Sequence, residues 1–360
     1  MGIVVKKPGV ATTVQDRGRV GYMGSGFSPS GVMDRRAFLI ANTLVENDLD
    51  ACVLEYALVG PTVRFTMPTF IALTGGDFAP KLDGKEIPLY TAIPVKRGSV
   101  LSMGSSRCGV YGYLAIAGGS LNVEPIMGSR STNLKCELGG WKGRTLEAGD
   151  YIPFQTKGVE FMSNLGSHRI PNDPIYPPPG HEVTLRVVPG PQYDMFSIEG
   201  KHTFFNDRFT TTVKCDRMGY RLDGPQIQTV HGSDIISDGI AFGAVQVPAH
   251  GRPIIMLADR QTTGGYAKIG TIVSVDIPKL VQSRPGTSIR FAPVTVHEAQ
   301  TSYRDEATYL HNLAKSVRRP CADGISPRRT ARRLMPILEQ QAKESQHESL
   351  WINSSEKERA

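Results

Sequence analysis

The chain has 360 residues, of which 40% are hydrophobic and 21% are charged, and a formal net charge of +7. This composition excludes a mostly disordered chain and predicts a globular protein of one large or two medium domains, with no apolar run long enough to span a membrane. Six arginines between residues 318 and 333, against a single acid, supply most of the charge excess, so the nearly balanced body argues against a nucleic-acid partner.

Up to about residue 295 the chain consists of short β-like runs separated by Gly, Pro, Asp and Asn. One substantial helix is expected in this part, from Arg35 to about Glu46, with Asp34 as its N-cap. The expected strands lie at 62–65, 70–74, 99–103, 110–117, 183–188, 209–213, 254–257, 269–275 and 289–291. The sequence therefore predicts a mainly β protein with few helices.

A proline-rich segment at 171–180 favours extended polyproline conformation and is interpreted as a linker. It would divide an N-terminal β-rich domain, 1–170, from a second β domain, 181–295. Apolar residues then recur at spacings of three and four, which predicts an amphipathic helix over 296–320. A basic and partly disordered tail is expected at 321–360.

Several sequence motifs are missing, and this restricts the kinds of functional site that the chain is expected to have. The five cysteines and eight histidines show no metal-ligand or disulfide spacing, so no bound metal is expected. The N-terminus has no apolar secretory segment, and together with the reduced cysteines this predicts a cytoplasmic protein. The motif GxxxxGK[ST] does not occur, which excludes a Walker-type nucleotide site.

The densest group of candidate site residues follows the expected strand at 254–257. Asp259, Arg260 and Gln261 bring a carboxylate, a guanidinium and an amide to one edge and are the candidate catalytic residues. The candidate binding residues that follow them are Thr262, Thr263, Gly264, Gly265 and Tyr266. The two glycines could adopt positive φ and present N–H groups to an oxygen atom. The alternative is a tight turn with a structural Asp259–Arg260 ion pair.

Other candidate binding residues lie outside this run. Gln246 is a lone amide in an apolar strand, which needs either a backbone partner or a ligand, and Asp238 precedes it in a polar turn. Arg217 and Arg221, in a basic and aromatic turn, could hold a carboxylate, although surface arginines commonly do so without function. The run 128–132 resembles an anion-binding nest, with Ser129, Arg130 and Ser131 as its donors.

Five motifs in collinear order carry a resemblance to a known family; they lie at 12–19, 30–34, 128–132, 237–240 and 259–266. Over roughly residues 3 to 295 the chain resembles the biotin-dependent carboxyltransferase family. That family includes allophanate hydrolase subunit 2-like proteins, the C subunit of bacterial ATP-dependent 5-oxoprolinase and part of urea carboxylase. The resemblance implies two cyclophilin-like β-barrel domains with a substrate site between them.

The resemblance also implies a function. It favours a subunit, inactive alone, that works with a subunit 1-like partner and an A-type subunit to open 5-oxo-L-proline to L-glutamate with ATP. One alternative is the carboxyltransferase component of a urea or amide carboxylase, with biotin supplied by another chain. A second alternative is a regulatory protein that antagonises a histidine-kinase inhibitor.

Both enzyme hypotheses demand a site for a small planar amide. Asp259 would accept a hydrogen bond from the amide N–H. Arg260, Gln261 and the backbone of Gly264 and Gly265 would stabilise the carbonyl oxygen as it gains negative charge.

Overall fold

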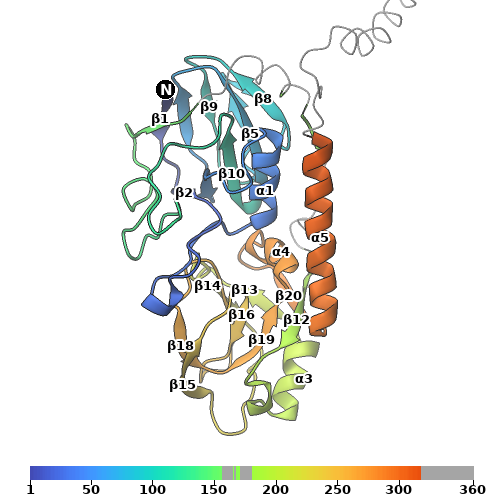
Figure 1. Ribbon diagram of the computed structural model, residues 1–360. Coiled ribbons are helices and arrows are strands. Elements are labelled where there is room, and N and C mark those ends of the chain that lie inside the picture. Colours follow the sequence, from blue (N-terminus) through green and yellow to red (C-terminus); the bar gives the residue numbers. More distant parts are fainter. Residues whose placement is uncertain (156–164, 166–167, 171–180, 318–360) are drawn as a thin grey trace, which may run out of the picture. The chain divides into compact units, whose positions relative to one another are not determined.

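The computed structural model describes residues 1–155, 165, 168–170 and 181–317. The described residues belong to one compact unit that runs from Met1 to Val317 (Figure 1). The expected linker at 171–180 and the tail at 321–360 lie outside the described residues, so the domain boundaries stay predictions. No helix in the described part is long and apolar enough to cross a membrane.

The N-terminal part is built from two sheets. One has the strand order β11-β1-β4-β9-β6-β7 and the other the order β2-β3-β10-β5-β8. The strands are β1 (Gly2–Lys7), β2 (Ala11–Gln15), β3 (Val53–Ala57), β4 (Thr62–Phe65), β5 (Thr69–Asp77), β6 (Lys81–Leu82), β7 (Lys85–Glu86), β8 (Ala92–Val95), β9 (Val100–Ser102), β10 (Cys108–Ile116) and β11 (Tyr151–Pro153).

The second of these sheets is covered by the first sheet on one face and by a helix on the other, so its central strands are buried on both faces. Leu54 and Tyr56 of β3 belong to the core shared with the first sheet. Helix α1 (Arg35–Leu44) packs against β5 and β10, and the carboxylate of Asp34 caps it by accepting from the Ala37 N–H at 2.9 Å. Every residue of β3 is therefore buried, including the carboxylate of Glu55.

The second part is a closed barrel with the strand order β12-β19-β16-β17-β14-β13-β20. A two-stranded sheet of β15 and β18 lies outside the barrel ring. The bounds are β12 (Val183–Pro189), β13 (Phe209–Thr211), β14 (Gly219–Asp223), β15 (Asp234–Gly239), β16 (Ala244–Gln246), β17 (Ile254–Met256), β18 (Thr263–Tyr266), β19 (Lys268–Ile272) and β20 (Ser288–Pro293). Closure leaves the ring without a free strand edge.

Short helices complete the barrel. Helix α3 (Ile198–Asn206) packs on β20, where the rings of Phe204 and Phe291 stack with their centroids 4.3 Å apart. Helix α4 (Ile277–Val281) follows β19, and three short 3-10 turns lie at η1 (Met23–Ser25), η2 (Tyr193–Met195) and η3 (Ser274–Asp276).

Gln282, directly after α4, joins the barrel to the N-terminal part. Its side-chain oxygen accepts from the backbone N–H groups of Val110 and Tyr111, at 2.8 and 3.0 Å. Its amide nitrogen donates to the Tyr111 carbonyl and to the Asp34 carboxylate, each at 2.9 Å. One buried amide thus completes the hydrogen bonds of β10 and of the cap of α1.

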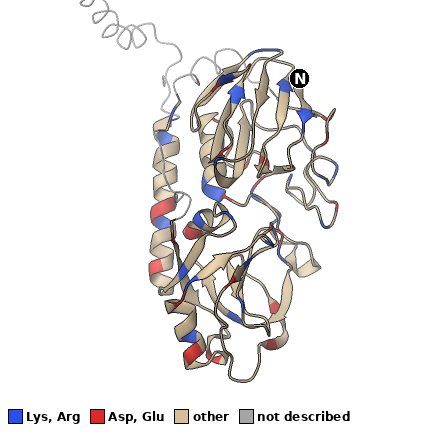
Figure 2. Ribbon diagram, turned by 180° about the vertical axis from the view of Figure 1, so that it is seen from behind, with Lys and Arg blue, Asp and Glu red and all other residues tan. Residues whose placement is uncertain are grey.

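Helix α5 (Val296–Val317) confirms the expected amphipathic C-terminal helix, of which residues 318–320 fall outside the described part. It lies along α1, where Arg36 forms an ion pair with Glu306 and stacks on the ring of Tyr309. Its outer face carries charges of both signs (Figure 2).

The mainly β prediction is confirmed, and all nine expected strands are present with small shifts at their ends. The strand expected at 269–275 ends at Ile272 because the 3-10 turn η3 follows, and α4 then begins at Ile277 with Pro278 in its first turn. The residues of β18 were expected to form a loop, and this was wrong, because β15 pairs with them. The short helices α3 and α4 were not anticipated.

Candidate functional site

A cavity of about 490 Å³ lies where the N-terminal sheets meet the barrel. Hydrophobic side chains form most of its wall, among them Leu58, Tyr111 and Val213. Its charged side chains are those of Glu55, Lys135, Asp216, Arg217 and Asp259, and the hydroxyls of Thr13 and Ser283 also line it. A mainly apolar cavity with a few convergent polar groups is the usual form of a small-molecule site.

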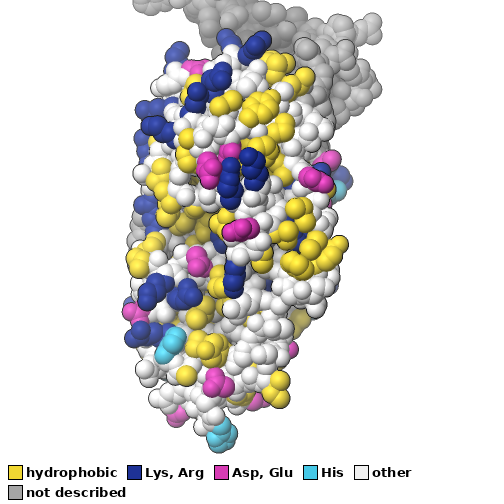
Figure 3. Space-filling view, turned by 90° about the vertical axis from the view of Figure 1, so that its left-hand side faces the viewer, with side chains coloured by type: hydrophobic (Ala, Val, Ile, Leu, Met, Phe, Trp, Pro, Cys, Tyr) yellow, Lys and Arg dark blue, Asp and Glu magenta, His cyan; other side chains and the backbone are white. Residues whose placement is uncertain are grey.

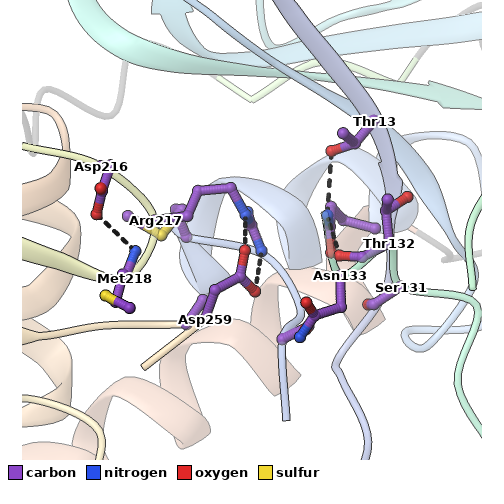
Figure 4. A network of polar contacts seen from close by, with 12 residues as sticks. Thr13, Ser131, Thr132, Asn133, Asp216, Arg217, Met218 and Asp259 are labelled. Atoms are coloured by element: carbon purple, nitrogen blue, oxygen red, sulfur yellow. Dashed lines mark hydrogen bonds and ion pairs between the residues drawn. The ribbon is translucent and has the colours of Figure 1, made fainter. Parts of the chain in front are cut away.

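Three of these side chains form one network, built from segments far apart in the sequence. Strand β3 supplies Glu55, the turn before β14 supplies Arg217, and the turn after β17 supplies Asp259. Arg217 donates from Nε to Asp259 Oδ2 at 2.8 Å and from Nη2 to Oδ1 at 3.2 Å (Figure 4). Its Nη1 donates to Glu55 Oε1. One guanidinium therefore holds two carboxylates, one from each part of the fold.

The network is largely shielded from water. The exposed fraction of the side chain is 2% for Glu55, 14% for Arg217 and 12% for Asp259. Burial raises the pKa of Glu55 above its usual value, although Arg217 opposes the shift. Burial alone would lower the pKa of Arg217, but Asp259 and Glu55 outweigh it and hold that pKa above its ordinary value.

The two carboxylates differ in what they can still bind. Glu55 Oε2 already accepts from the Met33 N–H at 2.8 Å and from the Tyr113 hydroxyl at 2.9 Å. Asp259 has Arg217 as its side-chain partner and borders the cavity. Because one guanidinium faces two carboxylates, negative charge is in excess at the cavity wall. Asp259 is thus placed to accept a hydrogen bond from a bound N–H group.

Arg260 points away from Asp259, so the ion pair considered between these neighbours is absent. Its guanidinium, in a residue that is 6% exposed, donates to the carbonyl oxygens of Ile240 at 2.9 Å and Leu257 at 3.2 Å. No carboxylate in the described part of the chain pairs with it, and burial lowers its pKa to about 10. Arg260 does not line the cavity, so this geometry does not favour its expected contact with a substrate carbonyl.

The remaining residues of the run 261–266 also differ from expectation. Gln261 is exposed, and Thr262 leads into β18. Gly264 and Gly265 lie in β18 without positive φ, so the expected turn conformation was wrong. The close approach there is real: a Cβ on Gly264 would lie 2.7 Å from Ile240 Cδ1 and 2.8 Å from Gln246 Nε2. None of 261–266 lines the cavity.

A second polar cluster lies around β18, apart from the cavity. Asp238 Oδ2 accepts from the ammonium of buried Lys268 at 3.0 Å, and this hydrogen bond lowers the pKa of Asp238. Gln246 is opposite Lys268 in the β16–β19 register, and its buried Nε2 has no hydrogen-bond partner in the described residues. The structure thus brings together Asp238, Gln246 and Gly264, which were all predicted as binding residues. Lys268 is a fourth member of this cluster.

The face of the protein that carries β15 and β18 is shown in Figure 3. Hydrophobic side chains lie there in separate groups among charged and other polar side chains. Tyr266 is 41% exposed on β18, and Ile236 of β15 projects almost entirely into solvent.

The other predicted binding residues separate into different roles. Of the two arginines near β14, only Arg217 reaches the cavity, since Arg221 donates to the Lys214 carbonyl at 3.0 Å on the surface. The nest at 128–132 does bind an anion, but the anion is the chain's own Asp16, as the next contacts show.

Asp16 Oδ1 accepts from the hydroxyls of Ser129 and Ser131, both at 2.6 Å, and Oδ2 accepts from the Arg130 N–H. The Arg130 guanidinium donates to the Val123 carbonyl at 2.8 Å. With these groups already engaged, the structure does not favour the expected contact of Ser129, Arg130 and Ser131 with substrate.

Among the charged residues of the cavity, Glu55 and Lys135 were not anticipated from the sequence. A signal for Glu55 was present, because a lone carboxylate stands in the apolar run 52–59, as Gln246 stands among apolar neighbours. Lys135 lies in an irregular polar segment and gives no such signal.

Comparison with known proteins gives a consistent family. Residues 25–293 match the family model described as "carboxyltransferase domain, subdomain A and B". The chain is 36% identical over 308 residues to the C subunit of 5-oxoprolinase from Escherichia coli, a match that covers 86% of this chain and 96% of that protein. The corresponding Haemophilus influenzae protein is 34% identical, over 85% of this chain and 95% of its own length.

Longer proteins contain a similar region. Urea amidolyase of Saccharomyces cerevisiae is 32% identical over 86% of this chain, but over only 18% of its own length. The solved urea amidolyase of K. lactis superposes with a TM-score of 0.77 at 29% identity, covering 87% of this chain and 20% of that one. The solved protein TTHA0988 gives a TM-score of 0.72 at 34% identity, over 81% and 56%.

Proposed function

The chain belongs to the carboxyltransferase domain family, and we propose that within it the chain is the C-type component of a hydrolase that opens 5-oxo-L-proline to L-glutamate with ATP. The observation that carries this proposal is the similarity to the C subunits of two bacterial 5-oxoprolinases over nearly the whole length of both chains. The urea amidolyase relatives are matched over a small fraction of their length.

The cavity suits the proposed substrate. Ring opening adds water across the amide C–N bond of 5-oxo-L-proline and yields the amine and the new carboxylate of glutamate. In our proposal Asp259 accepts a hydrogen bond from the ring N–H, while Arg217 holds the Asp259 carboxylate in place. The hydrophobic wall around Tyr111 and Val213 would contact the ring methylenes.

ATP use belongs to a partner in this proposal. The chain has no P-loop sequence. The nest at 128–132 is already filled by the Asp16 carboxylate, so it does not suit a phosphate group. We therefore propose a cytoplasmic complex with a subunit 1-like protein and an A-type subunit, in which the present chain contributes an amide site.

The purified chain alone is expected to release no glutamate from 5-oxo-L-proline, because it lacks a site for ATP of the usual kind. Adding the subunit 1-like and A-type partners with ATP should produce turnover. Glutamate would be measured for the single chain, each pair and the full mixture. Robust ATP-dependent turnover by the lone chain would overturn the proposed division of labour.

Lys135 is expected to recognise the carboxylate that distinguishes 5-oxo-L-proline from urea. It lines the cavity, and its ammonium makes no ion pair or hydrogen bond in the described part of the chain. Lys135→Gln should raise KM for 5-oxo-L-proline roughly tenfold, about 1.4 kcal/mol, with a much smaller effect on kcat. Lys135→Arg should restore most of the affinity.

The control for this experiment is Lys142→Gln, at a lysine seven residues later in the chain that does not line the cavity. A KM unchanged by Lys135→Gln would exclude the carboxylate contact but leave the proposed reaction standing. No activity in the wild-type complex would instead remove the reaction itself.

A carboxyltransferase component of a urea or amide carboxylase is the second candidate. The observation in its favour is the TM-score of 0.77 with two solved urea amidolyase and urea carboxylase chains. Biotin would then be supplied by another chain. Biotin-dependent carboxylation of urea by the chain with a biotin carboxylase, in the absence of 5-oxo-L-proline turnover, would select this candidate.

A further inference from the structure

A second cavity, of about 280 Å³, lies between α1, α5 and the segment that leads into α4. It shares no lining residue with the cavity that contains Asp259. Its volume lies just below the usual range for ligand pockets, roughly 300–1,000 Å³, which suits only a small ligand. Neither the ring-opening reaction nor the amide site makes use of it.

Positive charge is in excess around this cavity. Three arginines line it, against the single carboxylate of Glu306. Arg36 is held by Glu306, and Arg17 by Asp50 at 2.5 Å. The third, Arg35, is exposed, and its side chain makes no ion pair or hydrogen bond in the described part of the chain.

The rest of the wall is mainly hydrophobic. The cavity is lined from three sides by Leu39 of α1, by Val275 of η3 and Pro278 of α4, and by Tyr303 and Leu310 of α5. The guanidinium of Arg35, which is unpaired within the described residues, and the aromatic and aliphatic wall together form an amphipathic pocket. Such a pocket favours ligands that combine an anionic group with an apolar group.

We propose that this cavity binds a small organic anion, namely a phosphate or carboxylate group carried on a flat apolar ring. Arg35 contacts the anionic group, and the ring lies between Leu39 and Tyr303. A guanidinium pairs with phosphate or carboxylate through parallel N–H donors, which suits Arg35 because its donors are not engaged elsewhere in the described residues.

The position of the cavity links it to the amide site. Arg35 directly follows Met33 and Asp34 in the chain. The Met33 N–H donates to Glu55 at 2.8 Å, and the Asp34 N–H donates at 2.7 Å to the Tyr113 hydroxyl, which itself donates to Glu55. A ligand that shifts the first turn of α1 therefore acts on the carboxylate network through two hydrogen bonds. This link rests on the proposed function, whereas binding to the cavity does not.

Binding is tested on the full chain by titration calorimetry, so no catalytic activity is required. The probes are phenyl phosphate and benzoate, which carry the two proposed anionic groups on the same flat apolar ring, with inorganic phosphate as the headgroup alone. Phenyl phosphate or benzoate should bind at least tenfold more tightly than inorganic phosphate, and whichever binds better identifies the preferred anionic group.

Two variants act on the cavity in different ways. Arg35→Glu reverses the free charge, and Ala307→Trp fills the interior from α5, where Ala307 lines the wall. Each should weaken binding of the better probe at least tenfold. Arg304→Glu is the matched control, because it makes the same charge change on α5 outside the cavity, and it should alter binding less than twofold.

The outcomes separate clearly. No binding of any probe to the wild-type chain overturns the proposal, as does equal binding to wild type and Arg35→Glu. Tight binding of inorganic phosphate equal to that of both ring compounds also overturns it, since the apolar body would then contribute nothing. Thermal melting of each variant verifies that the chain is folded; should Ala307→Trp not fold, Arg35→Glu decides alone.

Discussion

Replacing Asp259 by Asn is expected to lower turnover of the assembled hydrolase by about 10- to 10²-fold, roughly 1.5–3 kcal/mol, the range for losing a hydrogen bond to a charged group. The amide has the shape of the carboxylate and keeps one oxygen for Arg217, so the fold should survive. It removes the charge that faces the cavity, and one of its two acceptor atoms becomes a donor. The measurement is glutamate release, with a melting curve for the variant.

Asp216→Asn provides the matched control. Asp216 also lines the cavity, but its Oδ1 accepts from the backbone N–H groups of Met218 and Gly219 at 2.8 and 3.0 Å, and an Asn oxygen can do the same. Its turnover should stay within a fewfold of wild type. If Asp259→Asn turned over like Asp216→Asn, Asp259 would be a structural partner of Arg217 and the reacting group would lie elsewhere.

Replacing Arg217 by Met should lower the free energy of unfolding by about 3–5 kcal/mol, because Glu55 would be left buried without its counter-charge. Adding Glu55→Gln to the same chain should recover much of this loss, since a neutral amide needs no counter-ion. Denaturant unfolding at pH 7 of the two single variants and the double variant gives the coupling between the residues.

The pH dependence of Arg217→Met adds an independent check. Burial raises the pKa of Glu55, and without Arg217 only the hydrogen bonds from the Met33 N–H and the Tyr113 hydroxyl oppose that shift. The folded state then binds a proton more readily than the unfolded state, so stability should return as the pH falls from 7 towards 5. Arg221→Met, at an exposed arginine, should cost no more than about 1 kcal/mol at either pH. A loss at Arg217 as small as this would show that Glu55 is not charged in the folded chain.

A strand could be predicted from the sequence wherever its residues are buried either alternately or continuously along its length. Strand β4 (Thr62–Phe65) and strand β20 (Ser288–Pro293) bury every second residue, and their sequences show the pattern. Strand β18 has the sequence Thr-Gly-Gly-Tyr and no buried face, so its conformation depends on β15, a partner about thirty residues earlier. Local pattern carries no information about such a partner.

Some residues of the site could be predicted from the sequence, but the contacts between them could not. Asp259 and Arg217 were each singled out from their own turns, yet their pairing joins positions 42 residues apart, and that of Arg217 with Glu55 joins positions 162 apart. For Arg260 the error runs the other way. Its position next to Asp259 in the sequence suggested an ion pair between the two side chains, but the structure has no such pair. The run 128–132 was interpreted as an anion-binding nest for substrate, but the carboxylate that its hydroxyls bind is that of Asp16, 113 and 115 residues away.

The amide of Gln282 has a consequence for how such a chain can change over generations. Four hydrogen bonds from this one side chain tie the barrel to β10 and to Asp34. A foreign barrel grafted onto the N-terminal sheets would have to reproduce that amide, as well as Arg217, in the same positions, or leave several buried groups unsatisfied at once. Exchange of one half by recombination is therefore penalised, and the two halves are expected to be inherited as a single unit.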